Sequence, residues 1–255
     1  MPIFKTMDKL KAKTTFKAIA ATILFAAFYG VNFTALSADL KTDRQGVYLA
    51  PGWGKLSFEA PAAGTYSLPV IGQAADGEVL DTEGESQSLA DLMDDKVTLL
   101  SFIYRTCDDV NGCPLSTMVL YTTGNKIAEQ QGLKDKLRIL TISFDPEFDT
   151  PEVMKEFSES LNVGKTIDWH FLTSQSDQAI KPVLESYQQS VVPDATNAGE
   201  GRNKFSHILR VYLIDRKKQI RNIYSMSFLH PDILINDVKT LLLEEAIAEA
   251  AINKK

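Results

Sequence analysis

From residue 97 onward, continuous apolar runs alternate with longer stretches in which apolar residues recur at helical spacing. The runs 97–104 and 137–144 are too short for helices and predict strands that are buried on both faces of a sheet. Residues 208–214 and 220–226 predict two more strands, which the polar turn 215–218 joins. These four runs supply the main strands of the predicted sheet.

Helical spacing and helix-end signals define the predicted helices. Pro114 stands at the first position of one helix, and Gly132 ends it. Pro151 lies in the first turn of another helix, which Asp149 or Thr150 caps. The predicted helices cover residues 114–131, 151–161, 177–189 and 231–250.

The order of these elements predicts the fold class. Strand, helix, strand and helix are followed by helix, strand, strand and helix, which is typical of an α/β, thioredoxin-like domain with a central mixed β-sheet flanked by helices. We assign this domain to residues 65–255. Residues 38–64, rich in Pro, Gly and Asp, predict an extended lead-in segment or a hairpin. Residues 191–204 lack periodicity and predict an irregular loop of functional or mobile character.

Residues 1–37 predict a targeting segment. The first 17 residues contain five lysines and one aspartate, and the apolar run 18–31 follows directly. Small residues at 35–37 have the spacing that signal peptidase reads, so we predict a signal peptide cleaved near Ser37. The alternative is an uncleaved membrane anchor, for which the apolar run is of marginal length. Both alternatives predict a periplasmic or otherwise extracytoplasmic protein, either soluble after cleavage or membrane-anchored.

The composition of the 255 residues is that of one globular domain with appendages, since 44% are apolar and 24% are charged. The formal net charge is −6, and it becomes −10 when residues 1–37 are left out. An acidic chain argues against nucleic acid as a partner and suits partners that are cationic or carry a metal. A total of two cysteines excludes a disulfide scaffold and a four-thiolate zinc site.

Cys107 and Cys113 are the first candidates for chemistry because they follow a buried strand and precede a helix. Ligands of open α/β sheets bind at this edge. The positive end of the helix lowers the pKa of a nearby thiol and favours the thiolate, which both nucleophilic attack and metal binding require. The alternative is a static disulfide that closes a small ring and contributes about 2.4 kcal/mol to stability.

Two common thioredoxin-like sequence motifs are absent from this chain. Thiol oxidoreductases of the usual type have two residues between their cysteines, whereas five residues lie between Cys107 and Cys113. Peroxiredoxins have Pro seven residues and Ser or Thr three residues before the reactive cysteine, but Leu100 and Tyr104 occupy these positions.

Two sulfurs and one imidazole would form a different site. Sulfur ligands suit Cu(I), and imidazole nitrogen suits Cu(II). His207 is the candidate nitrogen because it opens a predicted strand after a long irregular segment, which can bring it to the edge of the sheet near the cysteines. The alternative is a packed or surface histidine without a metal. We expect His170, at a buried strand end, and His230, before a helix, to have no part in the site.

Several of these stretches resemble the Sco/SenC family of thioredoxin-fold copper proteins. The similarity extends from about residue 63 to 243. Its most specific part is the Asp-Pro-x-x-Asp-Thr-Pro run that begins at Asp145. The matching stretches are residues 101–107 with Cys113 and Pro114, residues 142–152, residues 169–173, and Ser206-His207 with residues 211–215.

The resemblance implies that Cys107, Cys113 and His207 are the ligands of a copper ion, either Cu(I) or Cu(II). It also implies a chaperone that receives copper from a donor protein and delivers it to an apo cuproprotein, a subunit of cytochrome c oxidase whose binuclear copper site is being assembled. We interpret Asp145 and Asp149 as structural residues, forming a turn and a helix cap.

The chain departs from the family pattern in its cysteine loop. The family has Cys, Pro, two residues and then Cys-Pro, whereas this chain lacks the first Pro and has two extra residues, Gly112 among them. The wider loop still allows two sulfurs to bind one ion. It also admits Asp108 or Asp109 as an oxygen contact or as a solvated acidic rim.

Three functions follow from these residues. The first is a copper chaperone, in which the protein is not an enzyme. The second is a thiol-disulfide reductase that keeps the cysteines of a target copper site reduced, with Cys107 and Cys113 as catalytic residues and no metal. The third is a redox sensor or interaction module. His207 separates the first two functions because a reductase does not require it.

Overall fold

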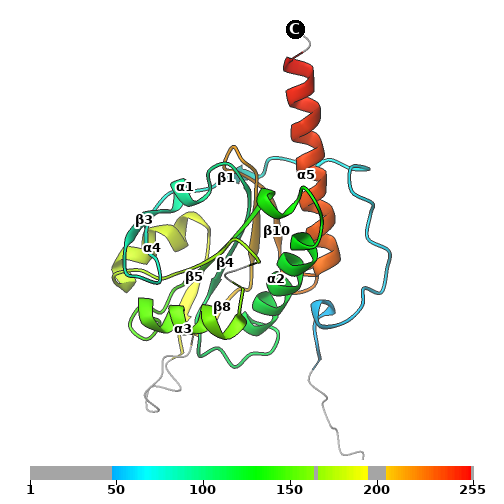
Figure 1. Cartoon of the computed structure of the whole chain (residues 1–255). Helices are drawn as coiled ribbons and strands as arrows, with labels where there is room; N and C mark the ends of the chain where they lie inside the picture. Colours follow the sequence, from blue (N-terminus) through cyan, green and yellow to red (C-terminus); the bar gives the residue numbers. More distant parts are fainter. Residues whose placement is uncertain (1–47, 164–165, 195–204, 254–255) are drawn as a thin grey trace, which may run out of the picture. The chain divides into compact units, whose positions relative to one another are not determined.

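The computed structural model describes residues 48–163, 166–194 and 205–253 of the chain (Figure 1). The predicted targeting segment, residues 1–37, lies outside them. Within the described ranges, no helix is both long and apolar enough to cross a membrane.

The elements follow one another in an alternating α/β order. The strands are β1 (Gly72–Gln73), β2 (Glu78–Leu80), β3 (Ser86–Ser88), β4 (Val97–Ile103), β5 (Leu137–Ser143), β6 (Trp169–Leu172), β7 (Val191–Pro193), β8 (Phe205–His207), β9 (Val211–Ile214) and β10 (Gln219–Tyr224). The helices are α1 (Leu89–Leu92), α2 (Cys113–Ala128), α3 (Pro151–Leu161), α4 (Asp177–Ser186) and α5 (Pro231–Ile252), with the short 3₁₀ helices η1 (Pro51–Trp53) and η2 (Lys134–Lys136).

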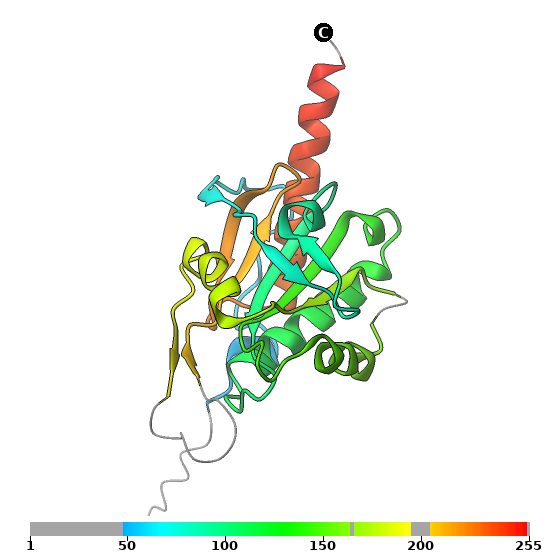
Figure 2. The same cartoon turned by 90° about the vertical axis from the view of Figure 1, so that its left-hand side faces the viewer.

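A six-stranded mixed sheet forms the centre of the domain, in the order β1-β10-β9-β4-β5-β6 (Figures 1 and 2). Strands β4, β5 and β6 are parallel, and β9, β10 and β1 are added by antiparallel pairing. The parallel strands β4 and β5 are buried almost throughout because helices cover both faces of the sheet. The predicted fold class, an α/β thioredoxin-like domain, is confirmed.

Alternate side chains of the central strands enter two separate cores. Val97 and Leu99 of β4 belong to the core beneath α2 and α5, whereas Leu100 and Phe102 belong to the core beneath α1 and α4. This alternation follows from the two-residue period of a strand. The chain leaves β4 at Ile103 and enters α2 at Cys113, so the cysteine loop lies at the carboxyl end of the central parallel strands.

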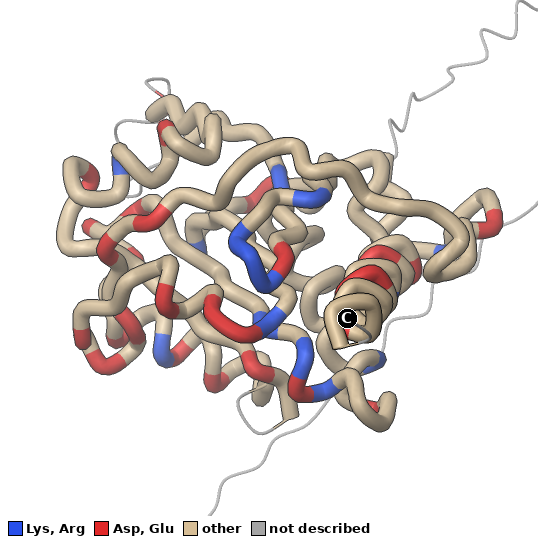
Figure 3. Tube along the Cα trace, turned by 90° about the horizontal axis from the view of Figure 1, so that it is seen from above, with Lys and Arg blue, Asp and Glu red and all other residues tan. Residues whose placement is uncertain are grey.

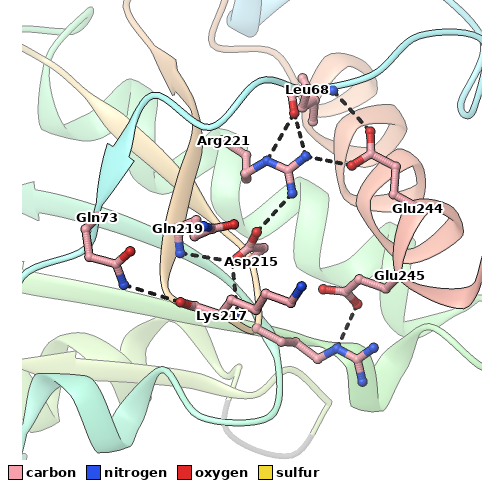
Figure 4. A network of polar contacts seen from close by, with 9 residues as sticks. Leu68, Gln73, Asp215, Lys217, Gln219, Arg221, Glu244 and Glu245 are labelled. Atoms are coloured by element: carbon pink, nitrogen blue, oxygen red, sulfur yellow. Dashed lines mark hydrogen bonds and ion pairs between the residues drawn. The ribbon is translucent and has the colours of Figure 1, made fainter. Parts of the chain in front are cut away.

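A network of charged side chains fixes the turn between β9 and β10 to helix α5 (Figure 4). The buried carboxylate of Asp215 accepts hydrogen bonds from the backbone N–H groups of Lys217 and Gln219. Asp215 also pairs with Arg221 at 2.9 Å, and Arg221 pairs with Glu244 of α5 at 2.6 Å. The Cα tube in Figure 3 shows basic and acidic positions interspersed along the chain. The hydrogen bonds and ion pairs of Asp215 and Arg221 show that the predicted polar turn links β9 and β10 to helix α5.

Several short elements differ from the sequence prediction. The described part of the lead-in segment, residues 48–64, has no strand and forms η1 instead of a hairpin. Residues 191–193, predicted to be irregular, form β7 and pair with β8. Residues 195–204 of the predicted loop lie outside the described residues. His207 ends β8 instead of opening the next strand, which begins at Val211. Strands of three residues leave no periodic signal in a sequence, which explains why β7 and β8 were not predicted.

Candidate metal and thiol site

The two cysteines lie in the loop after β4 and at the start of α2, and both are free thiols. Cys113 is the first residue of the helix and is 4% exposed, whereas Cys107 in the preceding loop is partly exposed. A Cβ atom on Gly112 would lie 3.2 Å from the sulfur of Cys107. The absence of a side chain at residue 112 therefore lets the Cys107 sulfur lie close to the backbone that leads into Cys113.

The structure places His207 next to the cysteines. Its Nε2 atom lies 3.6 Å from Sγ of Cys113, although the two residues are 94 positions apart in the sequence. The hairpin of β7 and β8 holds His207 opposite Val191. Two aromatic rings contact the imidazole, with centroid distances of 5.7 Å to Tyr104 and 5.1 Å to Phe144. Strand pairing and aromatic packing together aim the imidazole at the cysteine loop.

Burial lowers the pKa of His207 and outweighs the opposing effect of the Asp109 carboxylate. The imidazole is therefore neutral around pH 7. A neutral imidazole presents a nitrogen lone pair, which is the form that binds a metal.

The two thiols differ in charge. A hydrogen bond from the thiol of Cys113 lowers the pKa of Cys107 to about 6, with further bonds from the backbone and from Tyr104. Donating that bond raises the pKa of Cys113, and burial raises it further. At pH 7 the pair therefore consists of a Cys107 thiolate and a protonated Cys113. A thiolate is both a nucleophile and a ligand for soft metals.

Two hollows meet at Cys107 and Tyr104. The first, of about 440 Å³, is mostly apolar and lies between α2 and α3, with Met118, Tyr121 and Phe157 in its wall. The second, of about 560 Å³, opens between the cysteine loop and the β7–β8 hairpin. It is lined by Cys107, Asp108, Asp109, Asn111, Gly112, Asp194, Ser206 and His207 among others. A partner can therefore approach Cys107 from an apolar side and from a polar, acidic side.

The three candidate ligands do not form a finished metal cage in this structure. In the part of the chain that the structure describes, no three His, Cys, Asp or Glu side chains have the mutual spacing of a metal site. Donors that each lie about 2.0–2.3 Å from one ion fit a sulfur-to-nitrogen distance of 3.6 Å. The structure thus brings the nitrogen of His207 and the sulfur of Cys113 to a separation that a shared ion would allow.

The SCO1/SenC family model matches residues 74–243, well over half of the chain. The chain belongs to the SCO1/SenC family. The SCO1 protein homolog of Bacillus subtilis (strain 168) is 28% identical over 160 residues, which are 62% of this chain and 77% of that protein.

Solved structures of SCO1/SenC proteins have the same fold. ScoI of Bradyrhizobium japonicum with copper bound is 25% identical, with a TM-score of 0.55, and the match covers 66% of this chain and 99% of that one. Apo Sco1 of Thermus thermophilus is 21% identical, with a TM-score of 0.58, over 71% of this chain and 98% of that one. BsSco, a member of the Sco family of cytochrome c oxidase assembly proteins in which a disulfide switch was identified, is 23% identical, with a TM-score of 0.53, over 69% and 96%.

Asp149 of this SCO1/SenC chain is structural, but its role differs from the expected helix cap. Thr150 caps α3 through the backbone N–H of Val153. Asp149, 1% exposed, accepts hydrogen bonds from the hydroxyl of Ser143 at 2.5 Å and from the backbone N–H of Arg105 at 2.9 Å. It therefore holds the beginning of the cysteine loop. The carbonyl of Asp145 accepts from the backbone N–H of Asp149, which forms the expected turn.

We expect Asp149→Ala to lower the free energy of unfolding by about 2–4 kcal/mol, because the buried hydroxyl of Ser143 and the backbone N–H of Arg105 lose their acceptor. Urea-induced unfolding of the full chain measures this change. Asp149→Asn is the matched control, since its amide oxygen still accepts a hydrogen bond, and we expect it to lose about 1 kcal/mol. Equal losses in the two variants would show that the acceptor at residue 149 does not stabilise the loop.

The other two histidines have structural contacts. His170 in β6 pairs with Asp168 at 2.8 Å. His230 accepts from the backbone N–H of Asp232 and thereby caps α5.

Sequence reasoning missed two features of this SCO1/SenC site. Tyr104 and Phe144 hold the imidazole of His207, and residues far apart in sequence give no signal of such packing. The side chain of Asn111, which the sequence marks as a loop residue, forms hydrogen bonds with the backbone of residues 48 and 50. A polar side chain in the middle of the widened loop was the available signal for the second contact.

Proposed function

We propose that this protein is an extracytoplasmic copper chaperone. It binds one copper ion through Cys107, Cys113 and His207 and delivers it to an apo cuproprotein during assembly of cytochrome c oxidase. The observation that carries this proposal is the approach of the His207 imidazole to 3.6 Å from the Cys113 sulfur. Copper is the cargo of the protein in this proposal, received from a donor protein and passed on to the target.

The two cysteine sulfurs and the imidazole of His207 suit the binding and transfer of a copper ion. Two sulfurs favour Cu(I), and the neutral imidazole adds the nitrogen that Cu(II) favours. Cys113 is buried, whereas Cys107 is partly exposed between the two hollows. Ligand exchange therefore begins at Cys107, where sulfur or nitrogen atoms of a target can replace the protein's ligands one at a time.

Relatives support copper as the cargo and the oxidase as the destination. ScoI of Bradyrhizobium japonicum was solved with copper bound. BsSco belongs to a family of cytochrome c oxidase assembly proteins. The lysine-rich start and apolar run of residues 1–31 support export from the cytoplasm, with or without retention of a membrane anchor. A related SCO1/SenC protein from Bacillus anthracis is a lipoprotein.

Titration of the reduced full chain with Cu(I) and with Cu(II) tests this proposal. We expect one ion to bind per chain, and binding of both ions to fall below detection when Cys107→Ser and Cys113→Ser are combined. His170→Ala is the matched control, because it removes an imidazole that is hydrogen-bonded to Asp168 and leaves the cysteine loop in place, and we expect it to bind one ion as the wild type does. Failure of the wild-type chain to bind either ion would overturn the copper proposal.

The thiol pair supports a second function, that of a thiol-disulfide reductase for the cysteines of a target copper site. The Cys107 thiolate attacks a target disulfide and forms a mixed disulfide, and the first target sulfur leaves as a thiolate. Cys113 then gives up its proton and attacks the Cys107 sulfur, which releases the second target sulfur. The target gains two electrons, and the protein is left with a Cys107–Cys113 disulfide. The observation that favours this function is the lowered pKa of Cys107 beside a protonated Cys113.

A further inference from the structure

Residues 48–54, here called the clamp segment, make three hydrogen bonds to the cysteine loop. The side-chain oxygen of Asn111 accepts from the backbone N–H of Ala50 at 2.8 Å, and its amide nitrogen donates to the carbonyl of Tyr48 at 2.6 Å. The indole N–H of Trp53 donates to the carbonyl of Val110 at 3.1 Å. All three bonds therefore reach two adjacent residues in the middle of the widened loop.

The clamp segment is itself anchored to two helices. Gly52 of η1 is buried so tightly that a Cβ atom would lie 2.4 Å from the carbonyl oxygen of Leu229 and 2.9 Å from the side chains of Leu115 and Val119 in α2. The carbonyl of Gly54 accepts from the imidazole of His230 at 3.1 Å. Figures 1 and 2 show the blue segment that contains η1 beside α2. The cysteine loop is thus tied to a segment that the domain holds firmly.

Contacts inside the loop pass this restraint to the sulfur of Cys107. The backbone N–H of Gly112 donates to the carbonyl of Asp109 at 2.8 Å, and that of Asn111 donates to the Asp109 carboxylate at 2.9 Å. The Cys107 sulfur lies against Gly112, only 3.2 Å from where a Cβ atom on that residue would be. A shift of residues 110–112 therefore changes the position of the Cys107 sulfur.

We propose that Asn111 and Trp53 are positioning residues that keep the two sulfurs of the widened loop close enough to act as a pair. Five residues between two cysteines allow many loop conformations, and the ordering of Val110 and Asn111 by the clamp segment removes most of them. The clamp thereby raises the effective concentration of one sulfur at the other, for disulfide formation and for shared binding of an ion. The copper part of this inference rests on the proposed function, whereas the disulfide part is independent of it.

Asn111→Ala and Trp53→Phe test the clamp in the full-length chain. The measured quantity is the equilibrium constant for forming the Cys107–Cys113 disulfide in buffers of reduced and oxidised glutathione, determined by alkylation and mass spectrometry. We expect Asn111→Ala, which removes two hydrogen bonds, to lower this constant about tenfold, and Trp53→Phe, which removes one, about threefold. In the Cu(II)-loaded protein we expect the sulfur-to-copper absorption band to shift in both variants.

Asn236→Ala is the matched control. Asn236 donates to the carbonyl of Pro61 at 2.8 Å, so it ties another part of the lead-in segment to α5 without touching the cysteine loop. We expect its disulfide constant to stay within about twofold of the wild type. Trp53→Phe decides the question if Asn111→Ala does not fold. Wild-type constants in both clamp variants, or an equal change in Asn236→Ala, would overturn the inference. A wild-type chain that binds no copper would overturn the proposed function and leave the disulfide measurement as the test of the clamp.

Discussion

His207→Ala should lower the affinity for Cu(II) at least about 100-fold, because loss of a neighbour of a metal ligand already lowers affinity 10–100-fold. The imidazole lies 3.6 Å from the Cys113 sulfur, and in the proposed site it contributes the nitrogen that Cu(II) favours. For Cu(I) we expect a smaller loss, about tenfold, since the two sulfurs remain. Competition of the reduced protein with chelators of known affinity for each ion measures both effects.

His170→Ala is the matched control for this experiment. It removes an imidazole of the same kind, which pairs with Asp168 in β6 and does not contact the cysteines. We expect wild-type affinity for both ions in this variant. Wild-type Cu(II) affinity in His207→Ala would show that His207 is not a ligand, and the thiol-disulfide function would then be favoured.

The central architecture could be predicted from sequence because the apolar pattern determines it. The runs 97–104 and 137–144 became β4 and β5, and they differ from the structure by one residue at one end. Helix starts at Pro151 and Pro231 were also predicted correctly, since proline and a capping residue mark the first turn. These elements depend on local chemistry and on burial, and both leave a periodic signal in the chain.

The site was only partly predictable because its geometry depends on long-range contacts. Position alone identified the cysteines, at the end of a buried strand and the start of a helix. The approach of His207 depends on a hairpin of two three-residue strands and on the rings of Tyr104 and Phe144. The contacts of Asn111 depend on residues more than 60 positions away. No sequence period carries such pairings.

Alkylation of Cys107 by iodoacetamide should become faster with rising pH and reach a plateau with a midpoint at about pH 6. The thiolate is the reacting form, so the reaction is slow below this pKa, where the sulfur is protonated, and constant above it. An ordinary thiol has its midpoint near pH 8.5. At pH 6 we expect Cys107 to react about tenfold faster than an ordinary thiol, after allowance for the weaker nucleophilicity of a low-pKa sulfur.

Cys113→Ala tests the cause of this low pKa. The variant removes the thiol that donates to Cys107, which is the largest contribution to the lowering. We expect the midpoint of Cys107 alkylation to move above pH 7 in Cys113→Ala and to stay near 6 in the His170→Ala control. Cys113 itself should stay unmodified across this range in the wild-type chain, because burial and the donated bond raise its pKa. Mass spectrometry of the digested protein resolves the two cysteines.

The outcome bears on both candidate functions because each begins with a Cys107 thiolate. A wild-type midpoint near pH 8.5 would mean that Cys113 does not donate a hydrogen bond to Cys107. Cys107 would then be mostly protonated at pH 7, and neither copper binding nor disulfide exchange would begin from a thiolate. A midpoint near 6 together with weak Cu(II) binding in His207→Ala favours the chaperone. The same midpoint with unchanged Cu(II) binding in His207→Ala favours the reductase, since that chemistry needs the two sulfurs and no imidazole.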